Sequence, residues 1–206
     1  MPVWLKDKLW VRNLIKAELK FDGPIYFTEH HESHAASAFL VSPFKEAAIL
    51  TIDGVGEWAT ATYGVGKDND ITILKEIRFP DSLGLLYSAF TYYLGFKVNS
   101  AEYKVMGLAP YGKPAYYDKA MELIEIHDDG SFKMNMKYFD YVGRLKMTNR
   151  KFDALFGHPP RAPEGEELTQ FHMDMAATVQ KVTEDVVMKM GRFLHAQTGQ
   201  KYCCLA

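Results

Sequence analysis

The chain has 206 residues, 48% of them apolar, which is enough to bury one sizeable hydrophobic core. Its 24 basic and 26 acidic residues nearly balance, so we expect no nucleic-acid partner. No apolar run approaches the roughly 20 residues of a membrane span, and no signal-peptide core is visible. Cys203 and Cys204 are adjacent and form no disulfide framework, which favours a reducing, cytoplasmic location.

The N-terminal part is predicted to hold two helices joined by a short strand. Residues 3–20 have the pattern of a basic amphipathic helix, which we expect to pack on the domain rather than on a membrane. Asp22-Gly23-Pro24 ends that helix. Ile25–Phe27 is predicted to be a strand that leads into a second helix, which carries His30 and stops at Ser42-Pro43.

Apolar runs and turn residues then predict a small sheet. Residues 47–52 form a continuous apolar run typical of a buried strand. Residues 59–65 and 71–77 look like the next two strands of a meander, with a hairpin turn at 67–70. A helix over about 83–94 follows.

The second half is predicted to be less regular until its last long helix. Proline and glycine alternate through residues 107–114, which we therefore expect to be largely irregular. The turn-rich segment of about 127–167 is expected to be an insertion or cap rather than core. Residues 168–198 are strongly helical and are followed by Gly199, after which 202–206 begin a buried strand. A domain that ends inside a core strand is expected to be incomplete.

Three side chains form a candidate metal site. His30 and His34 are one helical turn apart, so both imidazoles can reach one ion. Asp53 follows the buried strand 47–52, and strand ends are where ligands bind in α/β folds. The zinc-protease signature is absent, because its glutamate position after the first ligand holds His31.

Other candidate residues each have a structural alternative. Gly54 and Gly56 let backbone N–H groups approach a phosphate, or simply make a turn before a hairpin. Gly84, near a helix start, allows a ribose or phosphate to come close, or allows close helix packing. Ser88 lies one turn later and would otherwise be solvated. Lys104 is a possible site for an anionic substrate, with an ordinary solvated lysine as the alternative.

Four motifs in order resemble the O-carbamoyltransferase family, which includes nodulation protein U and the tobramycin and cephem carbamoyltransferases. The motifs are His30–Phe39, Asp53–Trp58, Ser82–Ser88 and Glu102–Gly112. The resemblance runs from about Pro2 to Ala206. Ala101 departs from it, because the family usually has glycine before Glu-Tyr-Lys.

This resemblance implies an α/β fold of the ribonuclease H-like, actin-type ATPase class, here incomplete. Residues 1–206 would be part of one N-terminal domain related to the tRNA threonylcarbamoyladenosine synthase subunit, and an internal fragment of the whole enzyme. In the family, carbamoyl phosphate and ATP give carbamoyl-adenylate. The carbamoyl group then passes to a hydroxyl of a small acceptor near a bound iron, so Fe(2+) is the expected divalent metal.

The resemblance also assigns residues. His30, His34 and Asp53 match three metal ligands, and a fourth would come from sequence beyond Ala206, in the remainder of the full-length enzyme. Gly84 and Ser88 match positions that contact the adenylate. The turn of Asp53, Gly54, Val55, Gly56 and Glu57 would lie against its phosphate and carbamoyl end.

Two other interpretations stay open. A free-standing metal-dependent hydrolase would use His30, His34 and Asp53 to activate water, but it needs a general base that the sequence does not clearly place. An inactive remnant, or a module that only binds metal or nucleotide, is the other alternative.

Overall fold

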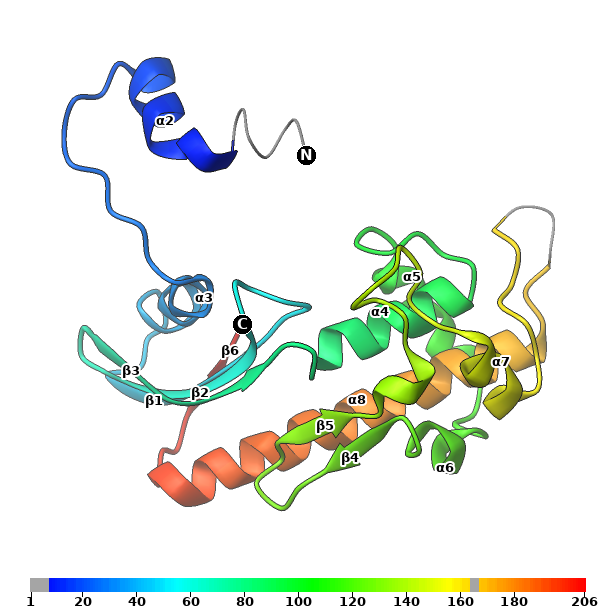
Figure 1. Ribbon diagram of the computed structural model, residues 1–206. Coiled ribbons are helices and arrows are strands. Elements are labelled where there is room, and N and C mark those ends of the chain that lie inside the picture. The colour runs from blue at the N-terminus through cyan, green and yellow to red at the C-terminus, as the bar shows by residue number, and fades with distance from the viewer. Residues whose placement is uncertain (1–7, 164–166) are drawn as a thin grey trace.

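The computed structural model describes residues 8–163 and 167–206 (Figure 1). Its helices, with short 3-10 helices labelled η, are η1 Lys8–Trp10, α2 Val11–Leu19, α3 His30–Phe39, α4 Leu83–Tyr93, α5 Glu102–Leu108, η2 Ala109–Tyr111, α6 Tyr117–Ala120, η3 Met136–Tyr138, α7 Arg150–Phe156 and α8 Gln170–Thr198. Its strands are β1 Glu46–Ile52, β2 Ala59–Lys67, β3 Asp70–Arg78, β4 Ile124–Ile126, β5 Phe132–Met134 and β6 Cys203–Leu205. The predicted α/β class is confirmed.

The main sheet has the strand order β3-β2-β1-β6. The first three strands form the predicted antiparallel meander, and the hairpin turn holds Asp68 in a left-handed conformation with φ of 52°. β6 returns from the far end of the chain and pairs with β1 in parallel, with Cys204 opposite Ile49. The predicted C-terminal strand is therefore present, although only Cys204 of it is buried, and it lies beside the strand that leads to Asp53.

The two faces of the sheet bury different clusters, because successive side chains of a strand point to opposite sides. Ala47 and Ile49 of β1 pack under α3 together with Cys204. Ala48 and Leu50 point the other way, into the larger core that α4 and α8 cover. The sheet thus lies between α3 on one side and a helical layer on the other (Figure 1).

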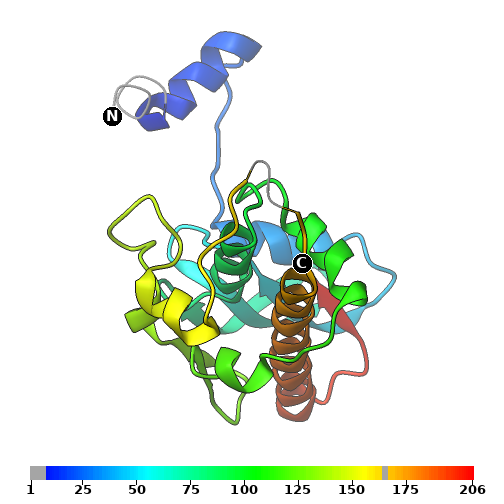
Figure 2. The same cartoon turned by 90° about the vertical axis from the view of Figure 1, so that its right-hand side faces the viewer.

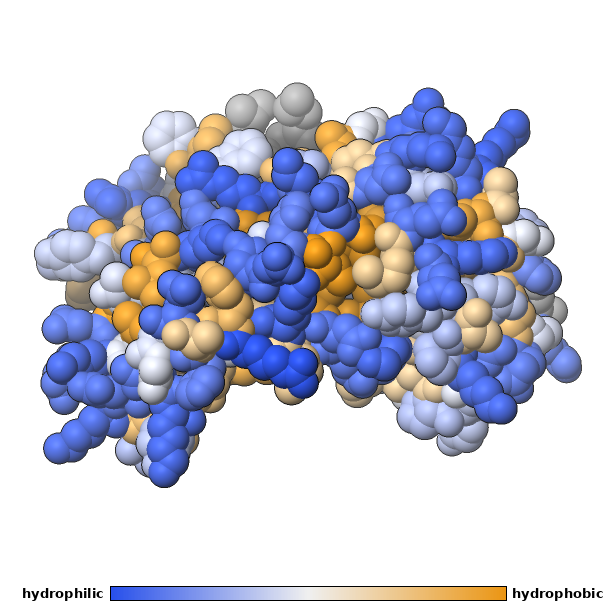
Figure 3. Space-filling view, turned by 90° about the horizontal axis from the view of Figure 1, so that it is seen from below, coloured by the Kyte–Doolittle hydropathy of each residue, from blue (hydrophilic) through white to orange (hydrophobic). Residues whose placement is uncertain are grey.

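The long helix α8 matches its sequence prediction closely. Thr169 and His172 form a reciprocal capping box at its start, and Gly199 ends it with φ of 66°. Ten of its side chains are buried, which explains how one helix can span the main core. Among the described residues, no helix combines the length and apolarity needed to cross a membrane. Most of the face viewed from below is hydrophilic, with an apolar patch near its centre (Figure 3).

The N-terminal segment differs from its prediction. Residues 25–27 form no strand, because no neighbouring strand pairs with them among the described residues, and Tyr26 is 84% exposed. The predicted helix over 3–20 is present as η1 and α2, while residues 3–7 lie outside the described part of the chain. α2 has no buried residue and stands apart from the body (Figures 1 and 2), so the expectation that it packs on the domain is wrong.

Two other predictions need correction. Residues 107–111 are helical rather than irregular, because Pro110 lies in the first turn of η2, where its missing N–H costs nothing. The segment 127–163 is not outside the core: Phe139, Phe152 and Phe156 are buried in the main cluster. Its standing as an insertion stays a prediction, and residues 164–166 lie outside the described chain.

The contact between α3 and the sheet can be tested at Gly66. A Cβ added there would lie 2.4 Å from the ring of Phe39. We therefore expect Gly66→Ala to lower the free energy of unfolding by about 1–3 kcal/mol through overpacking, measured by urea denaturation.

Gly191→Ala is the matched control. It lies within α8, and an added Cβ meets nothing within 4 Å, so the change should be neutral or stabilise by up to about 1 kcal/mol. Equal effects of the two substitutions would contradict the proposed packing of α3.

Candidate functional site

One face of α3 is fixed against the sheet, and this decides where its histidines point. His31, Ala35 and Phe39 recur every four residues and are the buried residues of the helix. His30 and His34 form the adjacent row, because a helical residue is rotated by about 100° from its neighbour. Burial of one row therefore directs the other along the sheet surface, toward the end of β1.

His31 fastens α3 to the sheet and is not a free ligand. Its Nε2 lies 2.9 Å from the carbonyl oxygen of Ala59, and its Nδ1 lies 2.6 Å from Thr51 Oγ1. A carbonyl only accepts, so Nε2 carries the hydrogen and Nδ1 accepts from the hydroxyl. Burial lowers the pKa of His31, although the Ala59 carbonyl opposes this, so the ring is neutral at neutral pH.

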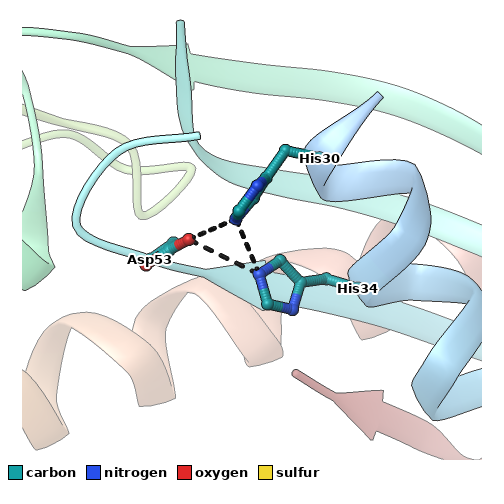
Figure 4. Close-up of side chains that lie close together, drawn as sticks. All are labelled: His30, His34 and Asp53. Carbon is teal, nitrogen blue, oxygen red and sulfur yellow. Dashed lines mark hydrogen bonds and ion pairs between the residues drawn. The ribbon is translucent and has the colours of Figure 1, made fainter. Parts of the chain in front are cut away.

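Asp53 meets the two outer histidines. It continues the β1 alternation that puts Thr51 on the α3 side of the sheet. Its Oδ2 lies 2.7 Å from His30 Nε2 and 3.4 Å from His34 Nε2, and the two nitrogens are 3.0 Å apart (Figure 4). The structure therefore brings together the three residues that the sequence nominated as metal ligands.

The distances between these three ligand atoms fit the coordination geometry of a divalent ion. Ligands at right angles around an ion, each at about 2.1 Å, are separated by about 3.0 Å. The three observed separations are 2.7, 3.0 and 3.4 Å. The side chains of His30 and His34 are 44% and 39% exposed, which leaves one side open to other ligands. The residues thus fit an ion that keeps open positions, and binding of the ion stays a prediction.

The surroundings of Asp53 keep its carboxylate ionised. Burial acts to raise its pKa, but the Gly54 N–H donates to Oδ1 at 2.6 Å and His30 lies beside Oδ2. These contacts prevail and lower the pKa, so the group is ionised at neutral pH.

The turn after β1 holds α3 in place. Glu57 Oε2 accepts a hydrogen bond from the backbone N–H of His30 at 3.2 Å, at the start of the helix. Gly56 donates to the Ala59 carbonyl at 2.9 Å, and a Cβ on it would lie 3.1 Å from the rings of both His30 and His31. Because the N–H groups of Gly54 and Gly56 are already engaged within the turn, they cannot cradle a phosphate as the sequence suggested without breaking these bonds.

The start of α4 touches the same turn. Ser82 Oγ accepts from Leu85 N at 3.0 Å and donates to the Gly54 carbonyl at 2.5 Å. A Cβ on Gly84 would lie 2.5 Å from the Asp53 carbonyl oxygen, so only glycine allows this approach. Close packing, the structural alternative for Gly84, is confirmed. Ser82 is a positioning residue that we missed, although a serine before an apolar helix is a recognisable N-cap signal.

A pocket of about 620 Å³ opens beside the turn. Four of the predicted site residues line it: Asp53, Gly54, Gly84 and Ser88. The sequence did not nominate the other polar residues of its lining, which are Tyr87, Asn99, Glu102 and Thr183. Its size suits a nucleotide-sized ligand.

Glu102 is the most strongly held of these missed residues. Its Oε1 accepts from Ser88 Oγ at 2.9 Å and from the backbone N–H of Asn99 at 2.8 Å. Burial acts to raise its pKa, but these hydrogen bonds lower it below the ordinary value. Its position as the first residue of the Glu-Tyr-Lys motif could have identified it from the sequence.

Two predicted residues lie elsewhere. Val55 faces a neighbouring pocket rather than the one beside Asp53. Lys104 is exposed on α5, two residues after Glu102 and hence on another side of that helix. The structure does not bring Lys104 to the pocket, and its role in substrate binding stays a prediction.

The Glu102 contacts predict a pH-dependent stability. A carboxylate with a lowered pKa contributes stability above its ordinary value of 4.5 and loses it as the pH falls through the lowered pKa. Glu102→Gln should therefore reduce the free energy of unfolding at neutral pH, and the difference from the unchanged protein should shrink in acid. Ser88→Ala should reduce the free energy of unfolding by a smaller amount, and this reduction should also shrink in acid. If the difference in free energy of unfolding between the Glu102→Gln variant and the unchanged protein stays constant with pH in denaturation experiments, this account is contradicted.

Comparison with known proteins shows which family model and which relatives the chain matches. Residues 2–206 match the family model described as Carbamoyltransferase N-terminus. The chain is 53% identical to the uncharacterized protein sll1178 of Synechocystis sp., with 100% of the chain and 35% of that protein aligned. It is 36% identical to nodulation protein NolNO of Sinorhizobium fredii, over 100% of the chain and 29% of that protein.

A third relative is nodulation protein NolO of Bradyrhizobium diazoefficiens, which is 34% identical over 86% of the chain and 30% of its own length. The chain therefore spans about a third of the length of these relatives.

Proposed function

Because the chain belongs to the carbamoyltransferase N-terminus family, we propose that it forms the transfer site of an O-carbamoyltransferase. In this proposal, carbamoyl phosphate and ATP yield carbamoyl-adenylate elsewhere in the longer enzyme. The carbamoyl group then passes to the hydroxyl of a small acceptor beside His30, His34 and Asp53. The convergence of these three side chains next to the 620 Å³ pocket is the observation that carries the proposal.

The strand arrangement supports the finer fold assignment. An antiparallel meander β1-β2-β3, with β6 parallel to β1 on its other side, agrees with the ribonuclease H-like half of an actin-type ATPase that we propose. In such α/β arrangements ligands bind beyond the carboxyl ends of the parallel strands. Asp53 lies at that end of β1, beside Ala206 at the end of β6.

The donor set suggests which ion the site would hold. Two imidazoles and one carboxylate with open positions form a set that suits Fe(2+). Such an ion supplies a positive charge that polarises a carbonyl oxygen. His30, His34 and Asp53 would hold it, while Ser82 and Gly84 fix the turn that carries Asp53.

The alternatives have less support. A metal-dependent hydrolase needs a general base near the ion, and Glu57, the acid on the adjacent turn, is bonded to the start of α3. A module that only binds metal or nucleotide agrees with the same geometry and differs in having no transfer activity. We further propose a reducing, cytoplasmic setting, in keeping with the free thiols of Cys203 and Cys204.

Metal binding is the first test. The double variant His30→Ala/His34→Ala should reduce bound Fe(2+) or Zn(2+) from about one ion per chain to nearly none, because removing two of three ligands leaves one carboxylate. Elemental analysis after dialysis measures this. The melting temperature without metal should change little, because both side chains are partly exposed.

His127→Ala is the matched control, because His127 is a partly exposed histidine on the β4–β5 hairpin. It should leave the metal content unchanged. An equal loss of metal in the control, or an unchanged content in the double variant, would show that the ion does not bind at α3.

Activity is the second test. The full-length protein that contains this chain should carbamoylate a hydroxylated acceptor when given carbamoyl phosphate and ATP. Residues 1–206 alone should not, because catalysis requires the closely held geometry of a complete site. Mass spectrometry of a panel of acceptors detects the added carbamoyl group. Turnover by residues 1–206 alone would show that the site is complete within them.

A further inference from the structure

A second pocket, of about 660 Å³, lies next to the turn that follows β1. Its walls are largely apolar and include the aromatic rings of Phe96 and Tyr141. Arg161 is built into one wall: its Nε donates to the Leu94 carbonyl at 2.7 Å, and its guanidinium carbon lies 5.2 Å from the centre of the Phe96 ring. The pocket therefore combines flat apolar surfaces with a fixed positive charge.

The described charged side chains that line this pocket are all basic. Lys97, Arg144 and Lys146 line it together with Arg161, and none of the described residues in its lining is an aspartate or a glutamate. Two acids outside the lining offset this charge in part: Asp140 lies 3.8 Å from Arg144, and Asp153 interacts with Lys146. Because the whole chain carries a net charge of −2, this concentration of positive charge is local. Such a pocket attracts anions.

The pocket adjoins the candidate transfer site. Val55 lines it, whereas the preceding Gly54 lines the pocket beside Asp53. Likewise, Leu85 lines the second pocket, and the preceding Gly84 lines the pocket beside Asp53. Asn99 lines both. A molecule held in the second pocket would thus lie across the turn from a molecule in the first.

We propose that this second pocket binds the acceptor, and that the acceptor is a hydroxylated ring compound with an anionic group, either phosphate or carboxylate. Lys97 and Lys146 hold the anionic group, and the aromatic walls hold the ring. The acceptor role rests on the proposed function, whereas binding of the anionic ring compound does not.

The transfer step then needs no further reactant. The acceptor hydroxyl oxygen forms a bond to the carbamoyl carbon of carbamoyl-adenylate. The bond from that carbon to the phosphate oxygen breaks, and AMP leaves with its electron pair. The hydroxyl proton passes to water.

Binding to the chain of residues 1–206 tests the pocket independently of catalysis. The probes are glucose 6-phosphate, glucuronate and glucose, which share one ring, together with inorganic phosphate. Calorimetry should show that at least one anionic sugar binds at least about tenfold more tightly than either glucose or inorganic phosphate. Lys97→Gln/Lys146→Gln should remove that preference over glucose, while the weak binding of glucose stays unchanged.

Lys45→Gln/Lys133→Gln is the control, because it removes two exposed lysines outside this pocket. It should leave all affinities unchanged. The proposal is overturned if neither anionic sugar binds at about 10 mM, or if inorganic phosphate binds as tightly as the sugars. It is also overturned if Lys97→Gln/Lys146→Gln has no effect. If the sugars bind in a lysine-dependent way but the full-length protein transfers no carbamoyl group, the proposed function is refuted. The assignment of this pocket as a binding site for anionic ring compounds would still hold.

Discussion

The seating of α3 on the sheet is the constraint on which the candidate site depends. His31 is held by Thr51 on β1 and by the Ala59 carbonyl on β2, so the helix is bonded to two strands at once. Phe39 and Ala35 fill the rest of the interface. Because a helix is rigid over ten residues, fixing this buried row also fixes the row that carries His30 and His34.

Asp53 connects three parts of the molecule. Its side chain faces α3, its carbonyl is approached by Gly84 at the start of α4, and its backbone N–H donates to the Thr60 carbonyl of β2 at 2.9 Å. A carboxylate held from several directions would lose little freedom on binding the predicted ion. The same contacts explain why glycine and serine are found at Gly84 and Ser82: one lets α4 come close and the other fastens it.

The turn after β1 separates two pockets of similar size and different character. One holds the ordered Ser88–Glu102 pair beside Asp53, and the other is lined by cations and aromatic rings. In the proposed transfer, each reactant would have its own binding surface, one on either side of this turn. Ala206 lines the first pocket, and the chain spans about a third of the length of the relatives that it matches.

Local periodicity was sufficient to predict much of this architecture. The apolar run 47–52 and the two following strands, the helix over 83–94 and the long helix before Gly199 are all confirmed. Histidines one turn apart and an aspartate at a strand end were likewise enough to nominate the three converging side chains. These patterns are local, and a buried helix face or strand face leaves a repeat in the sequence itself.

The tertiary structure alone decided which groups are already engaged. The family resemblance implied that Glu57 lies against the ligand, and the structure adds that its carboxylate accepts a hydrogen bond from the backbone N–H of His30, 27 residues earlier in the chain. The aromatic residues of 127–163 looked peripheral, but they enter the main core, and residues 25–27 have no strand beside them. Such outcomes depend on which distant segments meet, and the spacing of residues along a chain does not encode the partner of a hydrogen bond or the neighbour of a buried ring.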